Sequence, residues 1–150
     1  MPRNKKRKLE FEFVPDGCWY SNLRSILTKA QWDFIKQGAK ERANGVCSIC
    51  GKKTKYLDAH EQWVYDEKLG IQKLKDVIAV CKDCHSAIHI NRTWLKGNPE
   101  KAEDHYMKVN NCSYAEMRDD MGKANEKQQK LNEVSEWKLD VSWLKRFIKE

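Results

Sequence analysis

The sequence has no long apolar run, and this absence excludes whole classes of protein. Its 150 residues contain nothing near the roughly 20 consecutive apolar residues that a membrane-spanning helix needs. The basic beginning is followed by Leu9–Phe13, where Glu10 and Glu12 interrupt the apolar stretch that a secretory signal peptide requires. Internal repeats and low-complexity segments are also missing. We therefore expect a cytoplasmic protein that does not enter a membrane.

Positive charge is concentrated at the start of the chain. The formal net charge is +7, and five basic residues lie within the first eight positions: Arg3, Lys5, Lys6, Arg7 and Lys8. Because the rest of the chain is nearly neutral, these residues favour a polyanionic partner such as DNA. We predict that residues 1–13 form a basic, flexible arm that binds nucleic acid, and that residues 14–150 form a single domain.

Local signals predict helices on both sides of a β-rich centre. Two capping boxes, Thr28 with Gln31 and Ser113 with Glu116, mark helix starts. The expected helices cover residues 29–43, 82–90, 99–109 and 114–133, and the expected strands lie near residues 56–60, 77–80 and 137–141. This order predicts an α+β fold, in which a core over about residues 42–92 is wrapped by N- and C-terminal helices, with a helical extension over residues 98–150.

Four of the six cysteines form two CxxC pairs, Cys47 with Cys50 and Cys81 with Cys84. Each turn can present two thiolates on one side of a bend, and a tetrahedral zinc ion takes four such ligands. The second pair begins an expected helix, whose N-terminal end favours thiolates. This order of knuckle, hairpin and helix is the treble-clef arrangement, so we predict a structural zinc ion.

Other interpretations of the cysteines were weighed against zinc. Two disulfides would require an oxidising compartment. The sequence from Cys81 to His85 also matches the CxxCH pattern of haem attachment, but haem would leave the first CxxC pair unexplained. A redox role would need thiols that stay reactive with zinc present. We expect Cys18 and Cys112 to be ordinary buried or half-buried thiols.

Three of the four histidines fall in the same segment as the cysteines. His85 and His89 are four residues apart on an expected helix and so share one face, and His60 ends the strand expected beside it. Three imidazoles with an open coordination position suit a catalytic divalent cation. Glu61 follows His60 and could accept a proton from water. His105 has no partner in the sequence, and we expect ordinary packing or exposure for it.

These motifs together resemble the HNH, or ββα-metal, nuclease family. The residues that carry the resemblance are Cys47-x2-Cys50-Gly51, Leu57-x-Ala59-His60-Glu61 and the run from Asp76 through Cys81-x2-Cys84-His85 to His89. A wider pattern, from Val14-Pro15 to Trp143-Leu144, is similar to small bacterial and phage HNH-like proteins, which implies a bacterial cell or a phage-infected host.

The resemblance implies a DNA endonuclease with a ββα-metal core. His60, His85 and His89 would hold a divalent metal (Mg²⁺, Mn²⁺, Ni²⁺ or Zn²⁺), with Glu61 in the position of the general base and Asp76 in that of the family's asparagine. The implied catalytic residues are therefore His60, Glu61, Asp76 and His85. Around the helix, Lys82, Arg92 and Lys96 would neutralise phosphates.

Two departures from the family pattern open an alternative. Glu61 stands where the family commonly has histidine, and a glutamate is the weaker base. Asp76 adds negative charge where a phosphate would approach. The alternative is a treble-clef zinc protein without catalysis, which binds nucleic acid, or binds a host or phage protein as an inhibitor or recruiter.

Overall fold

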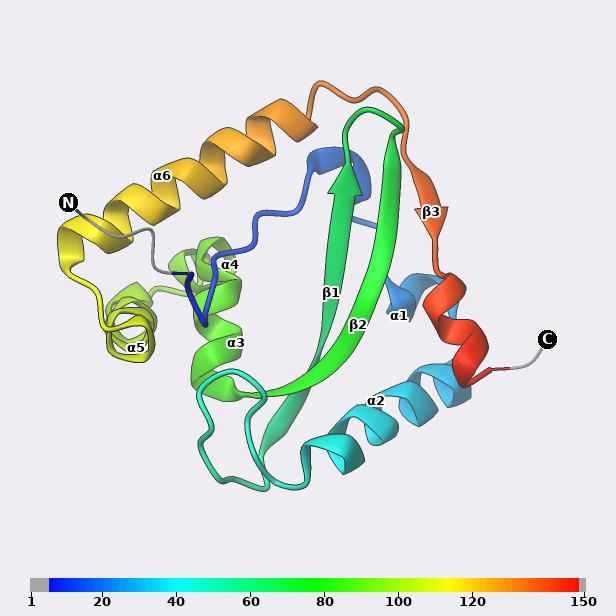
Figure 1. The fold of residues 1–150 in the computed structure, drawn as a ribbon, viewed down its shortest axis with the longest axis horizontal. Helices are drawn as coiled ribbons and strands as arrows, with labels where there is room; N and C mark the ends of the chain where they lie inside the picture. The colour runs from blue at the N-terminus through cyan, green and yellow to red at the C-terminus, as the bar shows by residue number, and fades with distance from the viewer. Residues whose placement is uncertain (1–5, 149–150) are drawn as a thin grey trace.

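A long antiparallel hairpin forms the centre of the computed structural model, which describes residues 6–148 (Figure 1). Strand β1 (Leu57–Asp66) pairs with β2 (Ile71–Cys81) in a register that sets His60 opposite Ile78, with an irregularity after Gln62. Strand β3 (Lys138–Asp140) pairs in parallel with the start of β2. The strand order is β1-β2-β3, so β1 lies at an edge of the sheet.

The two strands of the hairpin are longer than the sequence predicted, whereas β3 is shorter than the expected 137–141. The alternation near residues 56–60 continues to Asp66, and the apolar run at 77–80 is the end of an 11-residue strand. The turn between them uses Gly70 with φ +64°, where a Cβ atom would come within 2.9 Å of the Glu136 carbonyl oxygen. This turn needs glycine for both its φ angle and its space.

Six α-helices surround the hairpin within residues 6–148, and the fold is α+β as predicted. They are α1 (Leu23–Ile26), α2 (Lys29–Ala43), α3 (Lys82–Ile88), α4 (Ile90–Leu95), α5 (Pro99–Asn110) and α6 (Tyr114–Leu131). Two 3-10 helices, η1 (Asp16–Cys18) and η2 (Ser142–Arg146), flank them. None of the helices over residues 6–148 has the length and apolar composition that crossing a membrane requires.

The four predicted helices begin where the local signals place them, but α3, α5 and α6 end one or two residues from their predicted ends, at Ile88, Asn110 and Leu131. Both capping boxes form, and α2 spans the predicted residues 29–43, ending at Asn44 in the left-handed conformation. The helix predicted over residues 82–90 instead ends at Ile88, because His89 leaves helical geometry (φ −98°, ψ 51°) before α4 begins. This break separates the end of α3 from α4 at a candidate metal ligand.

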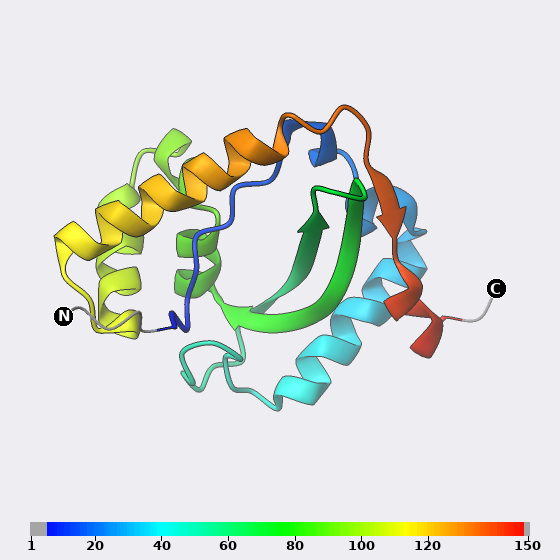
Figure 2. The same ribbon diagram turned by 45° about the horizontal axis from the view of Figure 1, so that its top comes forward.

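The hairpin packs against two clusters of apolar side chains. One joins it to α2 and the C-terminal segment, and its buried residues are Leu23, Trp32, Ile35, Ala39, Leu74, Val77 and Leu144. The other joins it to α3, α5, α6 and the N-terminal segment, and includes Leu9, Phe11, Val80, Ile88, Tyr106 and Met117. Figure 2 shows α2 on one side of the hairpin and α5 with α6 on the other.

The predicted flexible arm is wrong from Arg7 onward. Leu9 is fully buried, and the Phe11 ring stacks on Tyr106 with centroids 4.0 Å apart. The Arg7 Nε atom lies 2.8 Å from an Asp120 carboxylate oxygen. Apolar residues alternate in this segment, so it can bury one side against α5 and α6. Arg3 and Lys5 lie outside the described residues.

If residues 9–13 are part of the core, truncating Leu9 should destabilise the whole chain. We expect Leu9→Ala to lower the free energy of unfolding by about 2–5 kcal/mol, because it removes a fully buried side chain. Urea unfolding followed by tryptophan fluorescence measures this change. Phe34→Ala, at an exposed position of α2, is the control and should change it little. Equal stability of Leu9→Ala and the parent would mean that the segment is a free arm.

Candidate metal centres

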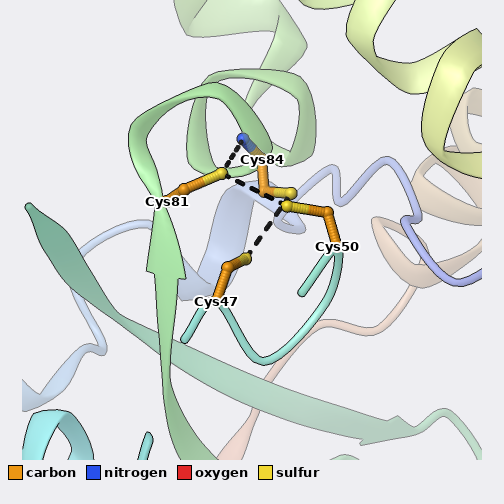
Figure 3. A group of neighbouring side chains, drawn as sticks. All are labelled: Cys47, Cys50, Cys81 and Cys84. Carbon is orange, nitrogen blue, oxygen red and sulfur yellow. Dashed lines mark hydrogen bonds between the residues drawn. The ribbon is translucent and has the colours of Figure 1, made fainter. Parts of the chain in front are cut away.

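The four paired cysteines meet where the end of β2 passes into α3. Cys47 and Cys50 lie on the loop after α2, Cys81 ends β2 and caps α3, and Cys84 lies in the first turn of α3 (Figure 3). Their sulfur atoms all lie within 4.8 Å of one another. All six cysteines of the chain are free thiols, so no disulfide competes for this cluster.

The spacing of the sulfur atoms fits a tetrahedral zinc ion. The Cys47 and Cys84 sulfurs are 3.8 Å apart, and those of Cys50 and Cys81 are 3.7 Å apart. Four thiolates at a Zn–S distance of about 2.3 Å would lie about 3.8 Å from one another at tetrahedral angles. These cysteines are therefore placed to hold a metal ion such as zinc.

Backbone hydrogen bonds shape the loop that carries the first pair. The Gly51 N–H donates to the Cys47 carbonyl, and Gly51 adopts φ +80°, which closes the knuckle. The Cys47 N–H donates to the Lys52 carbonyl, and the Ser48 N–H donates to Ala79 on β2. The loop is thus attached to β2 before any metal is considered.

Protonation of the thiols also favours a bound cation. The hydrogen bond between Cys47 and Cys84 lowers the pKa of Cys47, while the same contact, together with burial, raises the pKa of Cys84. Burial raises the pKa of Cys81. One thiolate is therefore stable in this cluster only at the expense of its neighbours, and a divalent cation removes that conflict.

His105 joins this cluster, contrary to our expectation that it has no partner. Its Nε2 atom lies 3.2 Å from the Cys84 sulfur. Helix α5 brings it there from 21 residues further along the chain, so no local pattern could reveal the contact. An N–H group donated to a thiolate orients the ligand and stabilises its charge.

The three predicted histidines form a second cluster. His60 comes from β1, His85 from α3, and His89 follows the last residue of α3. One ring nitrogen from each lies within 4.8 Å of the others, and their ring centroids are 5.0 to 5.6 Å apart. Burial lowers the pKa of His89 to about 3 and lowers that of His85. His85 and His89 are thus neutral near pH 7, the form that binds metals.

Two carboxylates that the sequence analysis did not select hold these histidines. Asp58 Oδ2 lies 3.0 Å from His85 Nδ1, which leaves the His85 Nε2 atom for a ligand. Asp58 also forms an ion pair with Lys82. Glu12 Oε2 lies 3.0 Å from His60 Nε2. Asp58 shares a strand face with His60, a pattern that could have indicated it, whereas Glu12 comes from the segment that we expected to be free.

The structure places the other two predicted catalytic residues differently. Glu61 points to the opposite face of β1 from His60, and its Oε1 accepts a 2.5 Å hydrogen bond from the Leu23 N–H. Burial raises the pKa of Glu61. Asp76 accepts a hydrogen bond from the neighbouring Val77 N–H and does not line the cavities that contain the histidines. The structure therefore does not bring Asp76 into the site.

Two cavities meet at the histidine cluster. The larger, of about 530 Å³, is lined by His85 and His89 together with the three predicted basic residues Lys82, Arg92 and Lys96. The smaller, of about 210 Å³, is lined by all three histidines, Glu61, Arg24 and Arg92. His85, His89 and Arg92 belong to both cavities, so a group bound at the histidines would lie near the Arg92 guanidinium as well as near the carboxylates of Glu12 and Asp58.

The described basic residues of the N-terminal segment, Lys6, Arg7 and Lys8, differ in their surroundings. Arg7 is engaged by Asp120, and this hydrogen bond raises the pKa of Arg7. Lys8 lines one cavity with Cys50, Lys52 and Lys108 and another with Glu12 and His60, while Lys6 is exposed. Around α3 and α4, the fold places Lys82, Arg92 and Lys96 in one cavity with His85 and His89.

No protein-family model, curated protein or solved structure matches this chain.

Removing the metal from the cysteine cluster should destabilise the protein. Cys47→Ser, or a strong chelator added to zinc-loaded protein, should lower the melting temperature by more than about 10 °C, because structural zinc contributes folding free energy directly. Differential scanning calorimetry with zinc analysis of the same samples measures both quantities. Cys112→Ser is the matched control and should retain zinc. A Cys47→Ser protein with unchanged zinc content and melting temperature would contradict the assignment.

Proposed function

We propose that this chain is a metal-dependent endonuclease of the HNH, or ββα-metal, type, which hydrolyses phosphodiester bonds of DNA. One observation carries the proposal: His60 of the hairpin, His85 of the following helix and His89 at the end of that helix converge where two cavities meet, beside Lys82, Arg92 and Lys96. The order of hairpin, CxxC turn and helix supports the same assignment.

We assign the cysteine cluster to a structural zinc ion in a treble-clef arrangement. The knuckle of Cys47 and Cys50, the hairpin and the helix that begins at Cys81 follow one another in that order. Zinc held there would fix the start of α3 against the loop after α2. His85 and His89 would then keep their positions relative to His60 without depending on a second metal.

The histidine cluster suits a second divalent cation, held by His60, His85 and His89. Such a cation supplies charge stabilisation for a phosphate and for the oxygen that leaves it. Asp58 would hold the His85 ring in the tautomer that leaves Nε2 unprotonated. Arg92, which lines both cavities, would bind the phosphate on either side of the histidines.

Glu61 is our candidate for the general base, on the resemblance and on its place in the smaller cavity. Its carboxylate would accept a proton from the attacking water as the water oxygen bonds to phosphorus and the bond to the leaving sugar oxygen breaks. The leaving oxygen would take a proton from solvent. The hydrogen bond from the Leu23 N–H fixes one carboxylate oxygen and so orients the other.

One observation favours the second candidate, a zinc protein that binds without catalysis. Glu12, Asp58 and Glu61 place three carboxylates around the histidines, and Glu12 contacts His60 directly. Negative charge of this density opposes a phosphate unless a cation is bound. Without that cation, the chain would bind nucleic acid or a host or phage protein as an inhibitor or recruiter.

Cleavage of supercoiled plasmid separates the two candidates. Zinc-loaded protein should nick plasmid when Mg²⁺, Mn²⁺ or Ni²⁺ is added, and Glu61→Gln should slow nicking by about 10²- to 10⁴-fold, because it removes the proton acceptor. Glu67→Gln, in the exposed hairpin turn, is the matched control and should nick as the parent does. Absence of nicking with every metal, in protein that retains its zinc, would favour the binding protein.

Metal affinity tests the role of Asp58 without any need for activity. We expect Asp58→Asn to weaken Ni²⁺ binding at the histidines about 10- to 100-fold, because the carboxylate no longer orients His85. Isothermal titration of zinc-loaded protein with Ni²⁺ measures this affinity. Asp76→Asn, the same change outside the cavities, should bind Ni²⁺ like the parent. Equal Ni²⁺ affinities of Asp58→Asn and the parent would show that Asp58 does not orient His85 for metal binding.

A further inference from the structure

Beside the histidines, the smaller cavity contains buried polar groups that have no hydrogen-bond partner. Four such side-chain atoms occur within residues 6–148, and three belong to residues that line this cavity: Trp32 Nε1, the Tyr65 hydroxyl and Gln72 Oε1. Gln72 is 1% exposed and Trp32 is 8% exposed. Folded proteins rarely leave buried polar groups unpaired, so a molecule bound in this cavity would supply partners that the protein itself does not.

The three atoms come from three different elements and differ in chemistry. Trp32 of α2 offers a donor, Tyr65 of β1 can donate or accept, and Gln72 of β2 offers an acceptor. The orientation of Gln72 is fixed, because its Nε2 donates to the Ser21 carbonyl at 2.9 Å. All three residues line the same cavity, so one small molecule that reached these atoms would pair all of them.

Aromatic side chains make up much of the cavity wall. Trp19, Trp32, Trp63 and Tyr65 all line it. Proteins commonly bind unpaired bases in this way: the base stacks on an aromatic side chain, and polar side chains form hydrogen bonds with the edge of the base. The combination favours a planar, polar, aromatic ligand over an aliphatic one.

The size and position of the cavity further limit which ligands can bind in it. Its volume of about 210 Å³ equals that of about seven water molecules in the liquid, which is room for one ring system but not for an extended ligand. His60, His85, His89 and Arg92 line the same cavity. A base bound inside would therefore keep the phosphate attached to its sugar next to the histidines and Arg92.

We infer that this cavity binds one unpaired nucleobase of a DNA strand, next to the phosphate at the histidine cluster. The inference rests on the proposed nuclease function and names its substrate: single-stranded DNA, or a duplex with an unpaired position. In a fully paired duplex the base must first leave the stack, which weakens binding.

Affinity for DNA, measured without cleavage, tests this pocket. The probes are a fluorescein-labelled single-stranded oligonucleotide and the fully paired duplex of the same sequence, added to zinc-loaded protein without further metal. Fluorescence anisotropy should show at least tenfold tighter binding of the single strand. Tyr65→Phe should weaken that binding about three- to tenfold, because it removes one hydrogen bond and keeps the ring.

Matched variants separate the pocket from general effects on folding. Tyr56→Phe makes the same change at an exposed position outside the cavity and should bind like the parent. Gln72→Leu should also weaken single-strand binding, and thermal melting shows whether each variant is folded. Folded Tyr65→Phe protein that binds the single strand as tightly as the parent would overturn the proposal.

The outcomes also distinguish this inference from the nuclease proposal. If the protein nicks no plasmid but binds single-stranded DNA more tightly than duplex, and this preference depends on Tyr65, the base pocket is supported and the nuclease proposal is contradicted. Metal-dependent nicking by a protein whose single-strand affinity is unchanged in Tyr65→Phe would support the nuclease and overturn the base pocket.

Discussion

The cysteine cluster at the junction of β2 and α3 is the constraint on which the rest of the site depends. Cys81 is both the last residue of β2 and the N-cap of α3, and Cys84 lies in the first turn of that helix. A metal ion that joined these two cysteines to Cys47 and Cys50 on the loop after α2 would fix the direction in which α3 leaves the hairpin. His85 follows Cys84 directly, so this constraint places two of the three histidines, His85 and His89. Separately, His105 connects α5 to the cluster, because its Nε2 atom contacts the Cys84 sulfur.

The edge position of β1 allows residues from both faces of this strand to line the same cavity. Side chains alternate along a strand, so His60 faces α3 while Glu61 faces α1. Because β1 lies at an edge of the sheet, one cavity can be lined by residues from both of its faces. The histidines, the half-buried Glu61 and the residues with unpaired polar atoms thus line one cavity, although they belong to opposite sides of the hairpin.

Sequence patterns predicted correctly those features that depend on residues close together in the chain, such as the bounds of α2 and the two metal-ligand clusters. Helix α2 matches its predicted bounds because a capping box begins it and Asn44 ends it, and both signals lie in the sequence itself. The cysteine and histidine clusters were predicted because their spacing along one hairpin and one helix determines their spacing in the fold. In these cases the chain brings the residues together over fewer than 45 positions.

Contacts between distant segments could not be predicted in this way. Glu12 meets His60 across 48 residues, and His105 reaches Cys84 from another helix. The burial of Leu9 and Phe11 depends on α5 and α6, which follow them by about 100 positions, so the basic charges beside them suggested a free arm. Asp76 was assigned by its position in the family motif, but the strand directs its carboxylate to its own backbone.

Anomalous X-ray scattering from crystals grown with zinc tests the central claim most directly. Data collected on both sides of the zinc absorption edge should show two peaks for each chain. One should lie among the sulfur atoms of Cys47, Cys50, Cys81 and Cys84, and the other among the ring nitrogens of His60, His85 and His89. A peak at the cysteines with none at the histidines, in crystals soaked with excess zinc, would contradict the account of the histidine cluster as a metal site.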